Sequence, residues 1–201
     1  TVFVDTTYEL QAHIFSTINA KQTRINASLA DNLLEFASVE TPEKVAHEIA
    51  KTMNATKGGP WHALIKMVGR VDEGNELLSQ HSFIFYLMPL VYNSTDHNKV
   101  RAALQKSGGK RDALSSDDYA SYPLWPLYRE GKDEVIRKVL ENYFGAVRAA
   151  FPDDWGSRKS ILTKTTGYSA LMKLLAFHLP RGIEQGDLSF EFFEKITKAA
   201  A

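Results

Sequence analysis

Residues 134–151 read EVIRKVLENYFGAVRAAF and decide the fold class of this chain. Apolar side chains recur there at steps of three and four residues for more than four turns, which is the spacing of one face of an α-helix. The inward set is Val135, Ile136, Val139, Leu140, Tyr143, Phe144, Val147 and Phe151. The charged side chains of the stretch lie mostly on the other side, and the sequence FPDDW at 151–155 ends the pattern. The stretch therefore predicts a long amphipathic helix packed against a core.

Further helices are predicted on both sides of this one. Toward the C-terminus, leucines and phenylalanines recur at helical spacing over residues 166–179 and 187–198. Toward the N-terminus, residues 42–55 start with a proline in the first turn, which is a common helix start. Residues 79–91 are almost free of charge and predict a helix buried on several sides, and residues 98–106 predict a short one.

Strand signals are few by comparison. Residues 1–4 read TVFV and predict one strand, and the alternation over residues 61–70 favours an extended segment. Capping-box patterns begin at Thr6 and Ser28 and predict two helices that flank a polar corner. The expected fold class is therefore α+β and predominantly α-helical.

Composition limits the classes of partner. The chain has 201 residues, and its 24 lysines and arginines balance 24 aspartates and glutamates, so no overall field attracts nucleic acid or a membrane. A DNA partner would have to be bound by a local patch. The absence of cysteine excludes disulfides and thiolate zinc sites. No apolar run approaches the roughly 20 residues that span a bilayer, so we expect no membrane partner and a cytoplasmic location.

The pattern along the chain predicts two parts. Residues 1–40 hold the strand, the helix, the polar corner and the next helix, and residues 41–201 form a helical body. Within that body, residues 93–128 are polar and irregular, which is typical of a flexible insert. Aromatic residues gather at its end, over 119–128, where they either fix a loop to the core or form a face between identical subunits.

The polar corner is one candidate binding site. It carries Asn19, Gln22, Arg24 and Asn26 at the exit of an apolar helix. Amides and a guanidinium at such a place bind phosphate or hydrogen-bond the edges of bases. The same groups also serve as caps for the helix end and the turn. The residues alone leave both readings open.

A second candidate site lies at Lys164-Thr165-Thr166-Gly167, with Arg158 nearby. The order of residues is not that of a phosphate-binding P-loop, and the partner motifs of penicillin-binding enzymes are missing. The segment predicts a helix N-terminus capped by Thr165 or Thr166, and this structural role is the plainer interpretation. The alternative is an anion site, because the positive helix end has Arg158, Lys159 and Lys164 nearby. Arg158, Lys164 and Thr166 are therefore candidate ligand-binding residues.

Catalytic and metal chemistry find little support. The six histidines are scattered without metal-ligand spacing, so each is expected to be a surface or packing residue. The carboxylate pairs at 117–118 and 153–154 lie in expected loops, and no G-x-S-x-G nucleophile motif occurs. We expect no catalytic residue, no metal and no cofactor.

Three runs carry a resemblance to a known family. IFSTINAKQTRINASLADNLLEF at 14–36, LSQHSFIFYLMPLVYN at 78–93 and NYFGAVRAAFPDDWGSRKSILTKTTGYSALMKLL at 142–175 resemble segments of DGQHR-domain proteins. This family is related to the ParB/sulfiredoxin-like fold and includes the DndB-type regulators of DNA phosphorothioation. The signature string Asp-Gly-Gln-His-Arg does not occur in the chain. In the family it lies upstream of the point where these residues begin, so activities that depend on it are not carried over.

The resemblance implies a fold and a function. It implies that residues 1–40 are the C-terminal part of a ParB-like core and that a helical bundle follows. It also implies a DNA-binding regulatory protein associated with DNA modification or phage defence. The alternatives are a nucleotide-binding or nuclease-like enzyme of the same fold and a homo-oligomeric assembly module.

Overall fold

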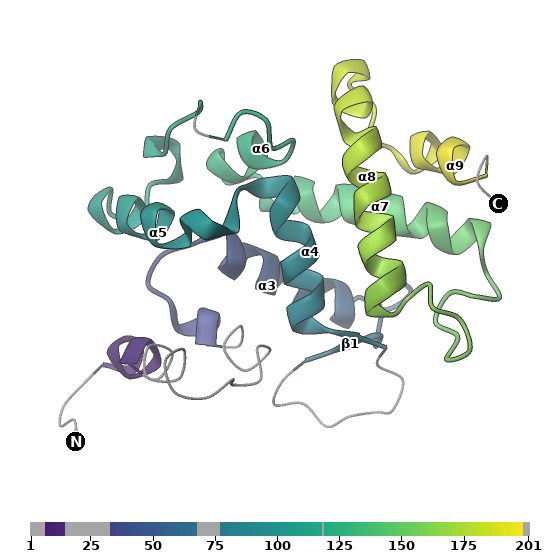
Figure 1. Cartoon of the computed structure of the whole chain (residues 1–201), viewed down its shortest axis with the longest axis horizontal. Helices are drawn as coiled ribbons and strands as arrows, with labels where there is room; N and C mark the ends of the chain where they lie inside the picture. The colour runs from purple at the N-terminus through teal and green to yellow at the C-terminus, as the bar shows by residue number, and fades with distance from the viewer. Residues whose placement is uncertain (1–6, 15–32, 68–76, 118, 199–201) are drawn as a thin grey trace.

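Helices make up most of the structure. The computed structural model describes residues 7–14, 33–67, 77–117 and 119–198 (Figure 1). The longer helices are α3 (Pro42–Ala55), α4 (Gln80–Val91), α5 (His97–Lys106), α7 (Asp133–Ala150), α8 (Thr165–Gln185) and α9 (Phe190–Lys198). Shorter helical pieces are residues 8–14, η1 (Leu33–Phe36), η2 (Ser94–Asp96), η3 (Arg111–Ala113) and α6 (Trp125–Arg129). The predicted predominance of α-helix is confirmed.

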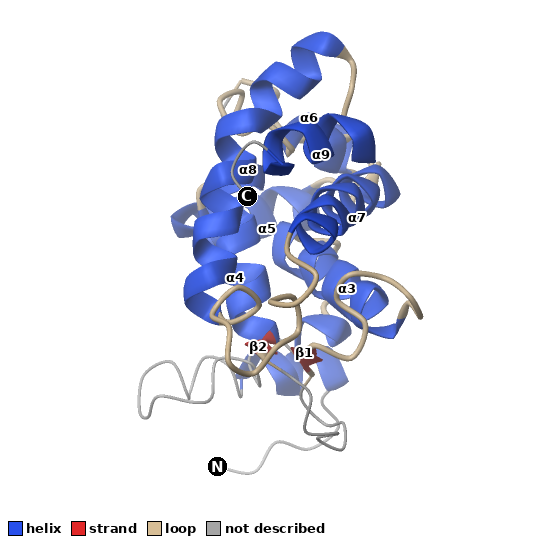
Figure 2. Cartoon of the chain, turned by 90° about the vertical axis from the view of Figure 1, so that its right-hand side faces the viewer, coloured by secondary structure: helices blue, strands red, loops and turns tan. Residues whose placement is uncertain are grey.

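Strands within the described ranges are limited to β1 (Ile65–Lys66) and β2 (Leu78–Ser79). They pair in parallel, with Ile65 opposite Leu78. Figure 2 shows this small sheet at one end of the helical body, and β2 leads directly into α4. The extended segment predicted over 61–70 is wrong for residues 61–64, which form turns, because Ala63 takes a left-handed φ of 56° that interrupts any strand. The strand predicted at 1–4 lies outside the described residues.

The core is built by packing α3 against α4, α4 against α8, and α7 against α9. Aromatic side chains fill its centre. The Trp61 ring lies edge-on to Phe144 and Tyr168, at centroid distances of 5.2 and 5.4 Å, and contacts Trp155 at 5.1 Å. Such edge-to-face pairs add to the burial of large apolar surface, which is the main force that holds the helices together.

The amphipathic pattern of α7 is confirmed in most positions. Ile136, Val139, Leu140, Tyr143, Phe144 and Val147 are buried. Val135 is an exception, because its side chain is 43% exposed. It lies in the first turn, about 100° around the helix axis from Ile136, and so falls beyond the edge of the buried stripe. Phe151 follows the helix as its C-cap residue and packs against the core.

The segment 93–128 contributes side chains to the core. Tyr119, Leu124, Trp125 and Tyr128 are buried. Hydrogen bonds fix the loop before α6, since Trp125 Nε1 donates to the Ser115 carbonyl at 3.1 Å. These aromatic residues therefore attach a loop to the core, which is one of the two roles predicted for them. The alternative, a face between identical subunits, stays a prediction. The flexibility predicted for residues 93–128 concerns motion, so it stays a prediction.

The division of the chain at residue 40 also stays a prediction. Only residues 7–14 and 33–40 of the first part are described. A ParB-like core in this part is therefore an expectation from the resemblance. In the described ranges, no helix has both the length and the apolar character needed to cross a membrane.

Candidate functional site

Two loops that are distant in sequence lie side by side at the end of the molecule that holds the small sheet. One connects α3 to β1 and the other connects α7 to α8 (Figure 1). Trp155 Nε1 donates a hydrogen bond of 2.7 Å to the Pro60 carbonyl. Arg148 Nη1 donates to the carbonyls of Gly58 and Gly59, each at 3.0 Å. These bonds hold the first loop against the second and against the end of α7, because they satisfy carbonyls of the first loop with donors from Trp155 and from Arg148 in the last turn of α7.

The paired loops concentrate positive charge. Residues 56–67 and 148–166 together hold six basic side chains and two acidic ones, Asp153 and Asp154, which leaves a net charge of +4 on a chain whose total is zero. The six residues, called the basic end below, are Lys57, Lys66, Arg148, Arg158, Lys159 and Lys164. All are exposed except Lys164, which is half-buried. Clustered cations of this kind attract polyanions.

The N-terminus of α8 adjoins the basic end. The N-cap position is Lys164, and no side chain caps it. The prediction that Thr165 or Thr166 caps the helix is therefore wrong, because both residues already belong to the first turn. The Thr165 hydroxyl lies 3.2 Å from the Ser82 hydroxyl, so it joins α8 to the start of α4. The first amides of an α-helix lack intrahelical acceptors and carry partial positive charge.

The structure brings the three described candidate residues together. Lys164 Nζ donates to the Arg158 carbonyl at 2.6 Å, which folds the loop back toward the start of α8. Thr166 is exposed in the first turn of that helix. The other four candidates, Asn19, Gln22, Arg24 and Asn26, lie outside the described residues.

Sequence reasoning missed Lys57, Lys66 and Arg148 as parts of this surface. Each is isolated in the sequence from the segment around Lys164. The local signal is the glycine and proline run at 58–60, which is typical of the end of a helix but does not indicate which other segment lies beside it. The neighbour is set by the packing of Trp155 beside Pro60.

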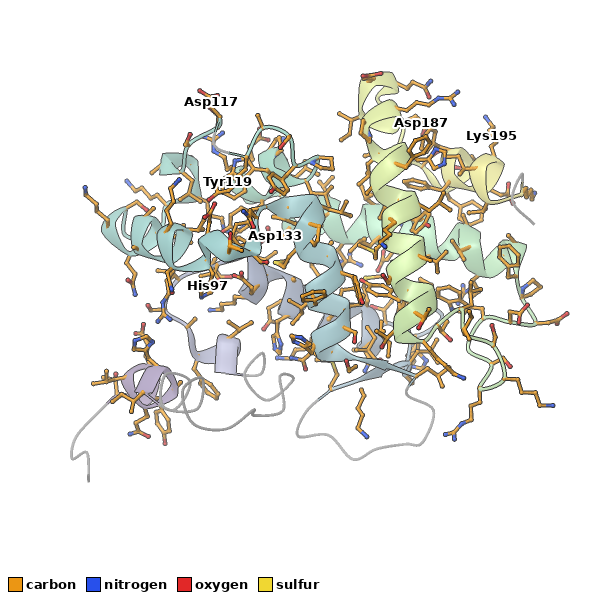
Figure 3. All side chains as sticks on the ribbon, in the orientation of Figure 1. His97, Asp117, Tyr119, Asp133, Asp187 and Lys195 are labelled. Atoms are coloured by element: carbon orange, nitrogen blue, oxygen red, sulfur yellow. The ribbon has the colours of Figure 1, made fainter. Side chains whose placement is uncertain are left out.

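A second polar cluster joins α3, α4 and α5. Glu43 accepts a hydrogen bond from the Tyr92 hydroxyl, and its other oxygen lies 3.0 Å from His97 Nδ1. Figure 3 shows His97 where α5 faces α3. The hydrogen bond to Glu43 raises the pKa of His97 above its ordinary value of 6.5, although burial opposes this shift. The cluster connects three helices, and this structural role is enough to explain why these polar side chains meet.

The remaining histidines and acids form no metal centre within the described ranges. His47 is buried and its Nδ1 lies 2.9 Å from the Gln80 amide, so it is a packing histidine as expected. His62 is exposed, also as expected. Asp153 and Asp154 lie in the turn after α7, as the sequence predicted.

Comparison of the chain with models of known protein families, with curated proteins and with solved structures finds no match. The basic end is therefore interpreted from its own chemistry.

Proposed function

We propose that this chain is a DNA-binding regulatory protein that contacts the phosphate backbone through its basic end. The single observation that carries the proposal is the meeting of two loops which, with the ends of the elements that flank them, hold six cations and two carboxylates in a chain whose total charge is zero. The resemblance to DndB-type regulators adds the context of DNA modification and phage defence. This function is consistent with the cytoplasmic location expected from the sequence.

The chemistry of the surface favours backbone contact over the reading of bases. Lysine and arginine side chains on loops reach phosphate oxygens and release condensed counterions when they bind. Arg158 and Lys159 are exposed and adjacent, so both can approach one strand. In the part of the chain that the structure describes, neither a recognition helix nor a groove-sized ribbon projects from this end, because the exposed basic residues lie on loops, in the two-residue strand β1 and in the last turn of α7.

The test is a duplex-binding titration at several salt concentrations with the variant Arg158→Ala/Lys159→Ala. Binding to each phosphate adds about 0.9 to the magnitude of the slope of log affinity against log salt, so the slope of the double variant should be smaller by about 1–2. Fluorescence anisotropy with a short labelled duplex gives both the affinity and the slope.

The matched control is Lys106→Ala/Lys110→Ala. It removes the same charge from the last residue of α5 and from the loop that follows it, and α5 lies on the opposite side of the molecule from the loop between α7 and α8 (Figure 1). The control should bind like the unmodified protein. An equal decrease of affinity in both variants would indicate a general charge effect and would remove the basic end from the proposal. Absence of binding by the unmodified protein at low salt would remove DNA binding altogether.

A further inference from the structure

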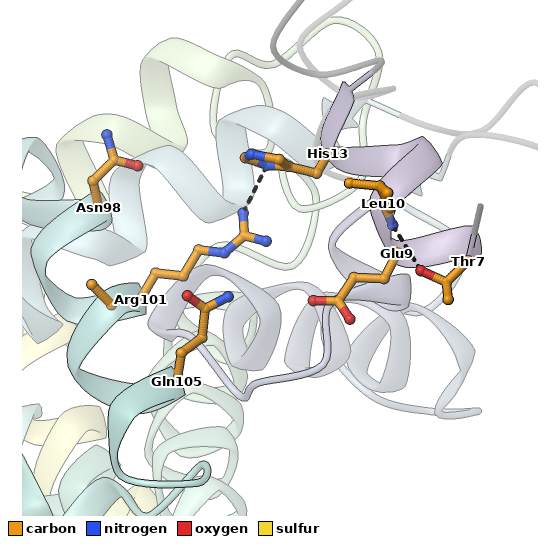
Figure 4. Close-up of a pocket in the computed structure, with 8 residues that line it drawn as sticks. Thr7, Glu9, Leu10, His13, Asn98, Arg101 and Gln105 are labelled. Atoms are coloured by element: carbon orange, nitrogen blue, oxygen red, sulfur yellow. Dashed lines mark hydrogen bonds between the residues drawn. The ribbon is translucent and has the colours of Figure 1, made fainter. Parts of the chain in front are cut away.

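A cavity of about 430 Å³ lies between the helix of residues 8–14 and α5 (Figure 4). These two helices lie on the side of the molecule away from the loop between α7 and α8 (Figure 1). The residues that matter to its chemistry are Glu9, Leu10, His13, Asn98, Arg101 and Gln105. A volume of this size is within the range of small-molecule sites, which is about 300–1,000 Å³. The basic end contributes no residue to it, so this site is independent of the proposed function.

Arg101 gives the cavity a positive pole. Its Nη1 lies 3.5 Å from His13 Nδ1, which is a long contact for a hydrogen bond. Among the residues that the structure describes, no carboxylate forms an ion pair with Arg101. A guanidinium whose N–H donors are not all used within the protein is the group that proteins use to bind a carboxylate or a phosphate. Figure 4 shows Arg101 extending from α5 toward the helix of residues 8–14.

Two amides support the same pole. Asn98 precedes Arg101 by three residues and Gln105 follows it by four, so all three side chains share one face of α5. Both amides line the cavity. They offer hydrogen-bond donors to an anionic group and acceptors to the rest of a ligand.

Glu9 gives the cavity a negative pole on the facing helix. One of its carboxylate oxygens accepts a hydrogen bond of 2.6 Å from Ser38 Oγ, which holds the side chain in place. Figure 4 shows this carboxylate pointing toward α5. Glu9 and Arg101 both line the cavity but form no ion pair with each other, so opposite charges face one another across unfilled space. Leu10 and Ala102 add apolar surface between the poles.

We infer that this cavity binds a small zwitterion of the amino-acid class. The carboxylate of the ligand accepts hydrogen bonds from the Arg101 guanidinium, and its ammonium group donates to the Glu9 carboxylate. The carbon skeleton contacts Leu10 and Ala102, and the amides of α5 complete the hydrogen bonds. A ligand with both charges gains two charge-assisted interactions, whereas a simple anion or amine gains one and leaves the other pole unpaired.

The test uses four probes that share a six-carbon chain. Norleucine and ε-aminocaproate carry both charges at different separations, caproate carries only the carboxylate, and hexylamine carries only the ammonium group. Isothermal titration calorimetry on the full chain at low salt should show that one or both zwitterions bind about 10-fold or more tightly than caproate and hexylamine. The preferred zwitterion reports the separation of the two poles.

Two variants assign the poles. Arg101→Gln should abolish binding of the preferred zwitterion, whereas Glu9→Gln should reduce its affinity to that of caproate. Lys106→Gln, an exposed change on the same helix, is the control and should bind like the unmodified protein. Circular dichroism of each variant verifies the fold.

The inference is overturned if neither zwitterion binds at millimolar concentration, if caproate binds as tightly as both, or if Arg101→Gln and Glu9→Gln leave the affinity unchanged. The same variants should keep the duplex affinity of the unmodified protein, since neither residue belongs to the basic end. Failure of one proposal is therefore distinguishable from failure of the other.

Discussion

Gly167 lies in the first turn of α8, where the preceding loop crosses the helix. A Cβ atom at this position would lie 2.3 Å from the Ile161 carbonyl oxygen and 2.5 Å from that of Leu162. Both atoms belong to the backbone, so neither can rotate away. The loop that ends here carries Arg158 and Lys159, and the missing side chain of Gly167 lets it close against α8. The sequence marked this glycine only as part of a short motif, because the need for close approach arises from the loop.

We therefore predict that Gly167→Ala destabilises the protein by about 1–3 kcal/mol, as overpacking does. Alanine normally stabilises a helix interior by about 1 kcal/mol relative to glycine, so the expected sign is opposite to the helix propensity. Gly145→Ala in α7 is the control, because its Cβ would meet Phe190 at an ordinary 3.5 Å. Urea denaturation should show Gly145→Ala as neutral or more stable. A more stable Gly167→Ala would contradict the close approach.

At the scale of elements, α3 and α5 are linked by the pair formed by Glu43 and His97. Only Val100 and Leu104 of the residues of α5 are buried, so the apolar contact of this helix with the core is small. The His97 side chain is 32% exposed, so solvent weakens the pair. A raised pKa of a histidine means that the protonated form is favoured by folding.

The sign of the pH effect follows from that shift. The folded pKa of His97 lies above the unfolded value of 6.5, so the pair contributes all of its stability below that value and loses it as the pH rises through the folded pKa. His97→Asn should therefore cost more free energy of unfolding at about pH 6 than at about pH 9, by about 1 kcal/mol or less. The exposed His62→Asn serves as the control. An equal cost of His97→Asn at both pH values would show that the pair is not linked to protonation.

At the scale of the whole molecule, the buried side chains form one connected core from α3 to α9. Phe193 of α9 is fully buried and contacts the Tyr143 ring of α7 at 5.3 Å. The tryptophans lie elsewhere, at positions 61, 125 and 155, so their fluorescence reports the rest of the core. A continuous core should unfold as one cooperative unit.

We predict that Phe193→Ala lowers stability by about 3–5 kcal/mol and shifts the unfolding midpoints of circular dichroism and tryptophan fluorescence together. Phe177→Ala is the matched control, because this side chain is 77% exposed and its removal should change stability by no more than about 0.5 kcal/mol. A decrease of helical signal before the change in fluorescence would show that α9 unfolds independently.

Much of the fold was predictable from the sequence, because helix signals are local. The start of α3 at Pro42 and the helix over α7 follow from residues a few positions apart, whose periodicity records which face is buried. The errors also have local causes. Residues 61–64 alternate like a strand, but the buried Trp61 and the left-handed Ala63 make them a turn. Val135 fits the apolar pattern of the sequence, but it lies in the first turn of α7, where its side chain stays exposed.

By itself, the sequence determined that the chain is predominantly helical, that it has no thiol chemistry and that any polyanion must bind to a local patch. Only the tertiary structure decided that the basic side chains of the two loops come together, since Pro60 and Trp155 are 95 residues apart and meet through a hydrogen bond. The same holds for the cavity between Glu9 and Arg101. Periodic burial is encoded within a few turns of chain, whereas a surface made by two loops depends on how every helix between them packs.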